Sequence, residues 1–199
     1  MRWDNLFDDL ESQLEQELNA EEIDVRAEEE RLRLGRMTMR DRLVALRETG
    51  APAGGGVRVL LTDGTAITVQ PVTFGRDWIS GDLVDESPRR SQCIVPIASI
   101  SALLLDRLQV AGSIEDREPA DEGRGLSRRL GLGFVLRDLC RRRAAVGLQL
   151  ADDLVHGTID RVGRDHLDLA AHEPGSQRRE SEVTHYRVVP FAQLLVVRL

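Results

Sequence analysis

Cysteine, aromatic side chains and long apolar runs are all scarce in this chain of 199 residues. Its two cysteines, Cys93 and Cys140, lie far apart and form neither a disulfide framework nor a zinc-binding pattern. No apolar run approaches the about 20 residues that cross a bilayer, and the N-terminus lacks the apolar core of a signal peptide. We therefore expect a cytoplasmic protein with two reduced, buried thiols, which binds no membrane.

Recognisable patterns of catalytic or ligand-binding residues are also lacking. No Ser-His-Asp or Cys-His arrangement has a known local signature, and the glycines at 54–56 lack the Gly-Lys-Ser/Thr of a phosphate-binding loop. The four histidines lack the close spacing of metal ligands; they are His156, His166, His172 and His185. We expect no enzyme activity, no cofactor, no metal and no small-molecule substrate.

Negative charge is concentrated at the N-terminus. Residues 1–35 hold twelve acidic side chains against four arginines, a net charge of −8, so the other residues carry about +1 of the total of −7. With 41% apolar but only 4% aromatic residues, branched aliphatic side chains must fill the cores. A nucleic-acid-binding domain usually has a basic surface, so the global balance argues mildly against that role.

The acidic segment is predicted to be an amphipathic helix over residues 3–34. Its apolar residues recur at the steps of three and four that place side chains on one helix face. The stripe consists of Trp3, Leu6, Phe7, Leu10, Leu14 and Leu18. An apolar stripe needs a partner, either the body of this protein or another chain, and we predict that it binds a protein partner as a helix in a groove.

Three short phrases occur twice in the rest of the chain, in the same order and at nearly the same spacing. The paired phrases are residues 59–64 and 148–153, 75–79 and 163–167, and 95–100 and 189–194. The middle pair reads Gly-Arg-Asp-Trp-Ile and Gly-Arg-Asp-His-Leu. A repeat of this length indicates two copies of one small β-rich module.

Each module reads as a short helix followed by strands. Residues 57–105 alternate between apolar and polar positions in about five short strands, the number in a small closed barrel. A stretch rich in Gly, Asp, Glu and Arg separates the modules and reads as an exposed linker. The predicted parts are an acidic helical arm (1–35), a helix plus first barrel (36–105), a linker (106–127) and a helix plus second barrel (128–199).

The turns of the modules carry a family resemblance. An Asp63-Gly64 turn follows the first strand, and a Gly-x-Asp phrase at 75–77 or 163–165 precedes the third. A helix and five strands with these turns resemble the Sm-like barrel, one of the SH3-like small β-barrels. Bacterial Sm-like proteins often lead into the last strand with a Val-Pro-hydrophobic phrase, found here at 95–97 and 189–191.

The resemblance implies two tandem five-stranded Sm-like or SH3-like barrels, each preceded by a helix, so a mainly β protein with helices. RNA-binding members carry an Asn shortly after the Asp of strand three and a basic pair in the later motif. This chain has neither, with Pro96 and Pro190 in the later motif. Trp78 and His166 follow the Asp directly, and they would either stack on a base or cover the end of the barrel.

An arginine-rich segment lies between the modules, over residues 124–143. It holds seven arginines against the single acid Asp138, a local charge of +6; the arginines are Arg124, Arg128, Arg129, Arg137, Arg141, Arg142 and Arg143. Such a segment would grip phosphates, pair with the acidic arm, or form a solvated charged face.

Two functions fit these features. The first is a non-catalytic adaptor or assembly protein that binds a protein partner or itself through the N-terminal helix and the barrel edges. The alternative is a diverged Sm-like RNA- or DNA-binding regulator that uses the arginine-rich segment. Its binding residues would be Arg128, Arg129, Arg137, Arg141, Arg142 and Arg143, with Trp78 or His166 as stacking surfaces.

Overall fold

The chain divides into two compact units, Met1–Thr38 and Met39–Leu199. The computed structural model describes residues 21–48, 56–84, 91–115, 126–176 and 178–199. In the first unit residues 21–36 form a helix, as predicted, whose acidic side chains pair with arginines one turn away, for example Glu30 with Arg33. The predicted stripe from Trp3 to Leu18 lies outside the described residues.

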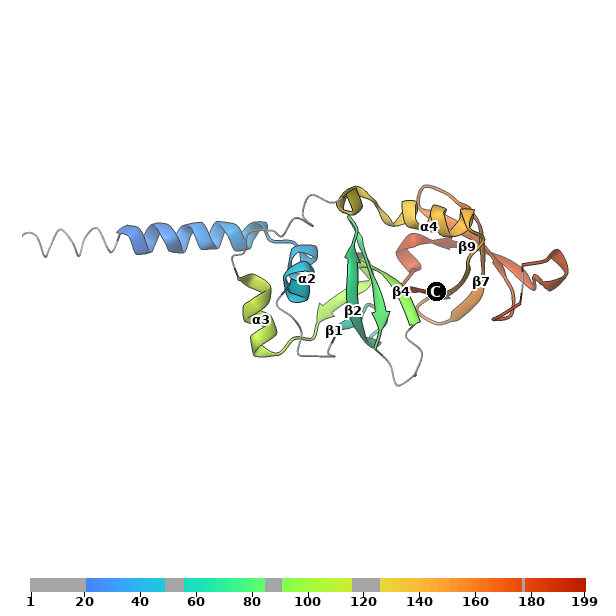
Figure 1. The fold of residues 1–199 in the computed structure, drawn as a ribbon, viewed down its shortest axis with the longest axis horizontal. Coiled ribbons are helices and arrows are strands. Elements are labelled where there is room, and N and C mark those ends of the chain that lie inside the picture. Colours follow the sequence, from blue (N-terminus) through green and yellow to red (C-terminus); the bar gives the residue numbers. More distant parts are fainter. Residues whose placement is uncertain (1–20, 49–55, 85–90, 116–125, 177) are drawn as a thin grey trace, which may run out of the picture. The chain divides into compact units, whose positions relative to one another are not determined.

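The second unit contains two similar series of elements (Figure 1). The first series is helix α2 (Met39–Glu48), strands β1 (Val57–Leu61), β2 (Ala66–Phe74), β3 (Trp78–Leu83) and β4 (Ser91–Pro96), the 3-10 turn η1 (Ile97–Ser99), β5 (Ile100–Leu103) and helix α3 (Arg107–Ile114). The second is η3 (Leu126–Arg129), α4 (Leu132–Arg141), β6 (Ala145–Gln149), β7 (Leu154–Val162), β8 (His166–Ala171), η4 (Glu180–Glu182), β9 (His185–Pro190), η5 (Phe191–Gln193) and β10 (Val196–Arg198).

All ten strands belong to one antiparallel sheet in the order β5-β1-β2-β3-β4-β10-β6-β7-β8-β9. The prediction of two separate closed five-stranded barrels is therefore wrong, although a mainly β protein with helices is confirmed. The reason lies in the edge strands. The last strand of the second series, β10, pairs with β4 of the first series instead of closing on β9. The hydrogen-bonding groups of β4 are satisfied by the other half, and the sheet stays open at β5 and β9.

The two halves of the sheet have the same strand pairing. Trp78 pairs with Pro96 across β3 and β4, and His166 pairs with Pro190 across β8 and β9. The register shifts between Pro71 and Thr73 in β2, and it shifts at the corresponding place between Ile159 and Arg161 in β7. The twice-written Gly-Arg-Asp phrase forms the same turn in both halves, closed by the backbone bonds Gly75 N to Trp78 O and Gly163 N to His166 O, of 2.8 and 2.9 Å.

Each half has its own apolar core, and strands β4 and β10 contribute to both. α2 supplies Leu43 and Leu46 to the first core, and α4 supplies Leu132 and Leu136 to the second. Successive side chains of a strand point to opposite faces. For this reason Val196 of β10 packs in the first core while its neighbour Val197 packs in the second. The halves therefore cannot be separated without exposing both cores.

The helices are tied to the sheet by specific polar contacts. Arg40 of α2 donates to the carbonyl of Gly75 over 2.7 Å. The backbone N–H of Leu132, at the start of α4, donates to Asp77 Oδ1 over 2.7 Å, so a turn of the first half caps the helix of the second. Helix α3 lies in the segment predicted to be a linker; it begins with a capping box at Asp106 and packs on α2.

Candidate functional site

The open edge strand β9 exposes large side chains. Tyr186 is 54% exposed and Val188 is 68% exposed. In the first half the strand at the same place is β4. Ile94 of β4 pairs with Ser80 of β3, and Val188 of β9 pairs in the same way with Asp168 of β8, so Ile94 corresponds to Val188. Ile94 is only 2% exposed, because it packs in the second core beside Val197 of β10. The same position of the fold is therefore buried at the junction and exposed at the edge.

The junction between β4 and β10 shows how such an edge is covered. Val197 lies opposite Ile94, and the N–H of Leu199 donates to the carbonyl of Gln92 over 2.9 Å. The buried hydroxyl of Ser99 donates to the carbonyl of Leu195 over 2.9 Å and holds the start of β10 in place. Backbone bonds, apolar contact and one buried side-chain bond thus join the two halves.

Strand β5, at the other end of the sheet, is the counterpart of β10. Leu103 of β5 pairs with Val59 of β1, as Val197 of β10 pairs with Leu148 of β6. In the described part of the chain β5 has no strand on its other side. The two edge strands of the sheet, β5 and β9, are therefore the counterparts of β10 and β4, which pair with each other inside it.

A shallow cavity of about 420 Å³ lies beside β9. Its walls include Val188 and Pro190, the turn residue Asp153, and Gln193 at the end of η5. Arg187 Nη1 lies 2.8 Å from Asp153 Oδ2 and ties β9 to the turn between β6 and β7. Gln193 is the last residue of η5, as Ser99 is the last residue of η1. Gln193 therefore occupies the position that corresponds to Ser99, whose buried hydroxyl donates at the junction.

Three of the six arginines in the predicted nucleic-acid-binding set are paired with carboxylates. Arg141 and Arg142 both contact Asp138, with Arg142 Nε 2.7 Å from Asp138 Oδ2. Arg143 Nη1 lies 2.9 Å from Asp160 Oδ1. The pairing reduces the positive charge that this part of the segment offers to phosphates.

The remaining predicted residues fall in several places. Trp78 is 5% exposed, packs in the second core and donates from Nε1 to the carbonyl of Leu130 over 3.0 Å. Its ring has no face for a stacked base, and this placement favours the packing interpretation. His166 is exposed, with Nδ1 2.9 Å from Asp165 Oδ1. Arg128 and Arg129 are exposed on η3, and Arg137 donates to the carbonyl of Gly163 over 3.2 Å.

Asp160 is the centre of an ion-pair cluster that the sequence did not indicate. Arg178 binds both of its oxygens, over 2.9 and 2.6 Å, and Arg143 binds one of them. The hydrogen bond from Arg178 is the main reason why the pKa of Asp160 is lowered. Asp160 lies in the bulge of β7 and Arg178 in the loop between β8 and β9, so only the folded chain brings them together.

The cysteines are free thiols. Cys93 is buried in β4, and burial raises its pKa to about 11. Cys140 is half-buried, and its Sγ donates to the carbonyl of Asp160 over 3.4 Å. Among the described residues, no three His, Cys, Asp or Glu side chains gather in a way that would hold a metal ion.

None of the helices in the described ranges has the length and apolar character of a membrane span. Comparison with known proteins gives no further assignment. No family model, no curated protein and no solved structure matches this chain. The Sm-like resemblance therefore stays a prediction.

Proposed function

We propose that this protein is a non-catalytic assembly protein that binds through the open edges of its sheet, and that a second copy of the chain is its partner there. The proposal rests on one observation. Val188 at the open edge is 68% exposed, whereas Ile94 at the corresponding place is 2% exposed because it packs in the second core beside Val197 of β10. Strand addition at an open sheet edge satisfies unpaired backbone groups and buries alternate side chains.

The internal junction supplies the register of the proposed contact. If β9 of one copy pairs with β5 of the next as β4 pairs with β10, Val188 lies opposite Leu103. The N–H of Leu105 then donates to the carbonyl of Tyr186, as the N–H of Leu199 donates to that of Gln92. The side-chain amide of Gln193 takes the place of the Ser99 hydroxyl.

The proposed contact joins two different surfaces, so it is heterologous. A pair of copies joined in this way still has one free β5 edge, on one copy, and one free β9 edge, on the other. Such head-to-tail contacts produce a closed ring if the rotation between copies closes, and a filament if it does not. Both products are distinct from a symmetric dimer.

The mass of the protein in solution tests the assembly. The wild-type chain should form oligomers in mass photometry, and Val188→Asp should give the monomer, because an unpaired carboxylate would be buried in the contact. Val72→Asp is the matched control, since Val72 is 58% exposed in β2, away from both edges. A wild-type chain that stays monomeric would contradict the proposal.

Disulfide cross-linking tests the register. In antiparallel pairs the Cβ atoms of directly opposite residues lie about 4.5–5.5 Å apart. In a Cys140→Ser background, Val188→Cys and Leu103→Cys chains should cross-link when they are mixed. Leu108→Cys is the control, because Leu108 is 83% exposed but lies on α3. Cross-linking with Leu108→Cys at the same rate would show that the register is wrong.

The N-terminal stripe stays a separate prediction within the same function. A protein partner that binds this stripe should be lost with Leu10→Asp and Leu14→Asp.

The nucleic-acid alternative also stays a prediction. Its binding should weaken steeply with salt and on changing Arg141, Arg142 and Arg143 to Glu, and the existing pairs of these arginines with Asp138 and Asp160 count against it.

A further inference from the structure

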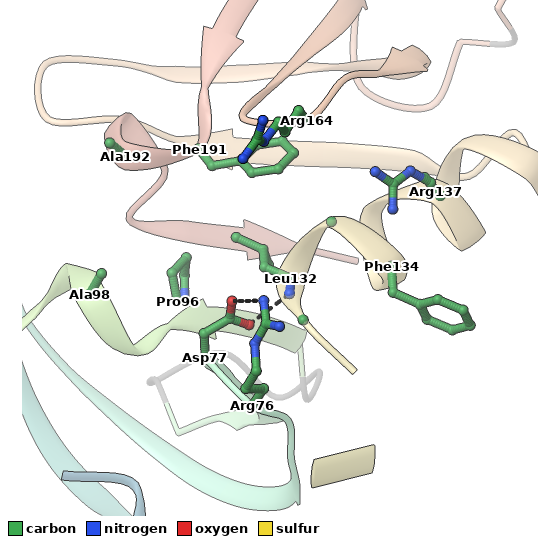
Figure 2. A pocket seen from close by; sticks show the side chains of 12 residues that line it. Arg76, Asp77, Pro96, Ala98, Leu132, Phe134, Arg137, Arg164, Phe191 and Ala192 are labelled. Atoms are coloured by element: carbon green, nitrogen blue, oxygen red, sulfur yellow. Dashed lines mark hydrogen bonds and ion pairs between the residues drawn. The ribbon is translucent and has the colours of Figure 1, made fainter. Parts of the chain in front are cut away.

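A second cavity lies where the two halves of the sheet meet, and three arginines line it. Its volume is about 440 Å³, within the about 300–1,000 Å³ of pockets for small ligands. The arginines come from three elements: Arg76 from the turn between β2 and β3, Arg164 from the turn between β7 and β8, and Arg137 from α4. Figure 2 shows their side chains around the cavity, with Leu132 between Arg76 and Arg164 and with Asp77 beside Arg76.

The repeated phrase places two of these arginines. Arg76 and Arg164 are the second residues of the two Gly-Arg-Asp phrases, which form the same turn in each half. Because the halves join through β4 and β10, both turns line one cavity. A single barrel would supply only one such arginine.

The one acidic residue of the cavity is already engaged. Asp77 accepts the N–H of Leu132 through Oδ1, and its Oδ2 lies 3.3 Å from Arg76 Nη2. The Arg164 side chain is exposed. Three arginines and one aspartate leave a charge of +2 on the lining. A phosphate monoester carries about −1.5 to −2 and offers three terminal oxygens to guanidinium groups.

Glycine at the start of α4 keeps the cavity open. A Cβ on Gly131 would lie 2.6 Å from Arg76 Nη2, and a Cβ on Gly133 would lie 3.4 Å from the Phe191 ring. Side chains at these positions would displace the arginine and narrow the space.

Part of the cavity lining is apolar. Pro96, Leu132 and Phe191 contribute to it, and Leu132 and Phe191 belong to or pack against the second core. A bare phosphate ion would leave this part in contact with water. An organic group attached to the phosphate would cover it and gain apolar contact.

We infer that this cavity binds a small organic phosphate monoester, with its phosphate held by Arg76, Arg137 and Arg164 and its organic part against Pro96 and Phe191. The site lies within one chain and does not require the assembly proposed above. Its ligand differs from a nucleic-acid strand, because the charge of the lining matches one terminal phosphate.

Titration of the full chain with phenyl phosphate tests this inference. Amide resonances in a ¹H–¹⁵N spectrum should shift at Gly131 and Gly133, at constant ionic strength. Phenyl phosphate should bind more tightly than inorganic phosphate or phenol, because it fills both parts of the cavity. Benzoate should bind more weakly, since a carboxylate offers fewer oxygens and less charge.

The variant Arg164→Ala should reduce the affinity for phenyl phosphate by about tenfold, the typical effect of losing one charge-assisted contact. Its fold is checked by circular dichroism. Arg161→Ala is the matched control, because that arginine is 84% exposed in β7 and does not line the cavity. An equal loss with Arg161→Ala would indicate non-specific charge attraction and overturn the inference. No shift with phenyl phosphate, equal binding of benzoate, or binding of a single-stranded RNA oligomer alone would also overturn it.

Discussion

Strands β4 and β9 occupy the same place in the two halves of the sheet, and their surroundings are opposite. Both follow the third strand of their half in the same register, and both lead into a 3-10 turn through a Val-Pro pair. β4 is covered by β10 and holds the almost fully buried Ile94, whereas β9 ends the sheet and exposes Val188. The same local fold thus gives a core strand in one half and an open edge strand in the other, depending on what lies beside it.

Truncating the two equivalent residues should show the largest difference. Ile94→Ala removes buried apolar contact from the second core and should lower the free energy of unfolding by about 2–5 kcal/mol. Val188→Ala removes exposed surface and should change it by no more than about 0.5 kcal/mol in the monomer. Urea denaturation at a concentration where the chain is monomeric measures both. Equal losses would mean that β9 is covered as β4 is.

Adding a methyl group to the two turn glycines sharpens the same comparison. A Cβ on Gly75 would clash with the indole of Trp78, which is buried, and Gly75→Ala should cost about 1–3 kcal/mol as overpacking. A Cβ on Gly163 would meet the ring of His166, which is exposed and can move away. Gly163→Ala should therefore lower the thermal midpoint less than Gly75→Ala. The reverse order would show that the two aromatic rings do not play the roles described above.

The bulge of the second strand differs between the halves in its charge. Asp160 in β7 stands where β2 has Val72, and Arg178 and Arg143 lower its pKa in the folded state below the about 3.9 of an unfolded chain. The ion pairs of Asp160 stabilise the fold fully at pH values above its pKa in the unfolded chain. This contribution is lost as the pH falls through the pKa of Asp160 in the folded state. Asp160→Asn should lower the urea midpoint at pH 7, and its difference from wild type should shrink at acid pH. Val72→Asn should change the midpoint little at either pH.

The smallest expected effect concerns the reactivity of the Cys93 thiol and involves no change in the stability of the protein. Cys93 lies in the covered strand β4, where burial raises its pKa to about 11, so its thiolate is scarce at pH 8. Iodoacetamide should leave Cys93 unmodified in the native protein at pH 8 and modify it after unfolding in urea, as read by peptide mass spectrometry. Rapid native modification of Cys93 would mean that the β4–β10 junction opens readily.

Local features of the fold were predictable from particular residues. The Gly-Arg-Asp phrases are turns in both halves, because glycine leaves room for the ring of Trp78 or His166 that follows. Alternating apolar residues marked the strands β1 to β3 and β6 to β8. Helix α3 was not predicted, because its eight residues have little amphipathic pattern and lie in a segment whose composition is typical of loops. The arginine cavity was missed because Arg76, Arg137 and Arg164 are far apart along the chain.

The sequence by itself determined which segments become strands and turns, because side-chain periodicity and glycine positions act over a few residues. Only the tertiary structure decided which strand edges meet. Backbone N–H and C=O groups are the same at every edge, so β10 could have paired with β9 or with β4 on hydrogen bonds alone. The choice of β4 places Val196 in the first core and Val197 in the second, and that burial depends on both halves being folded together.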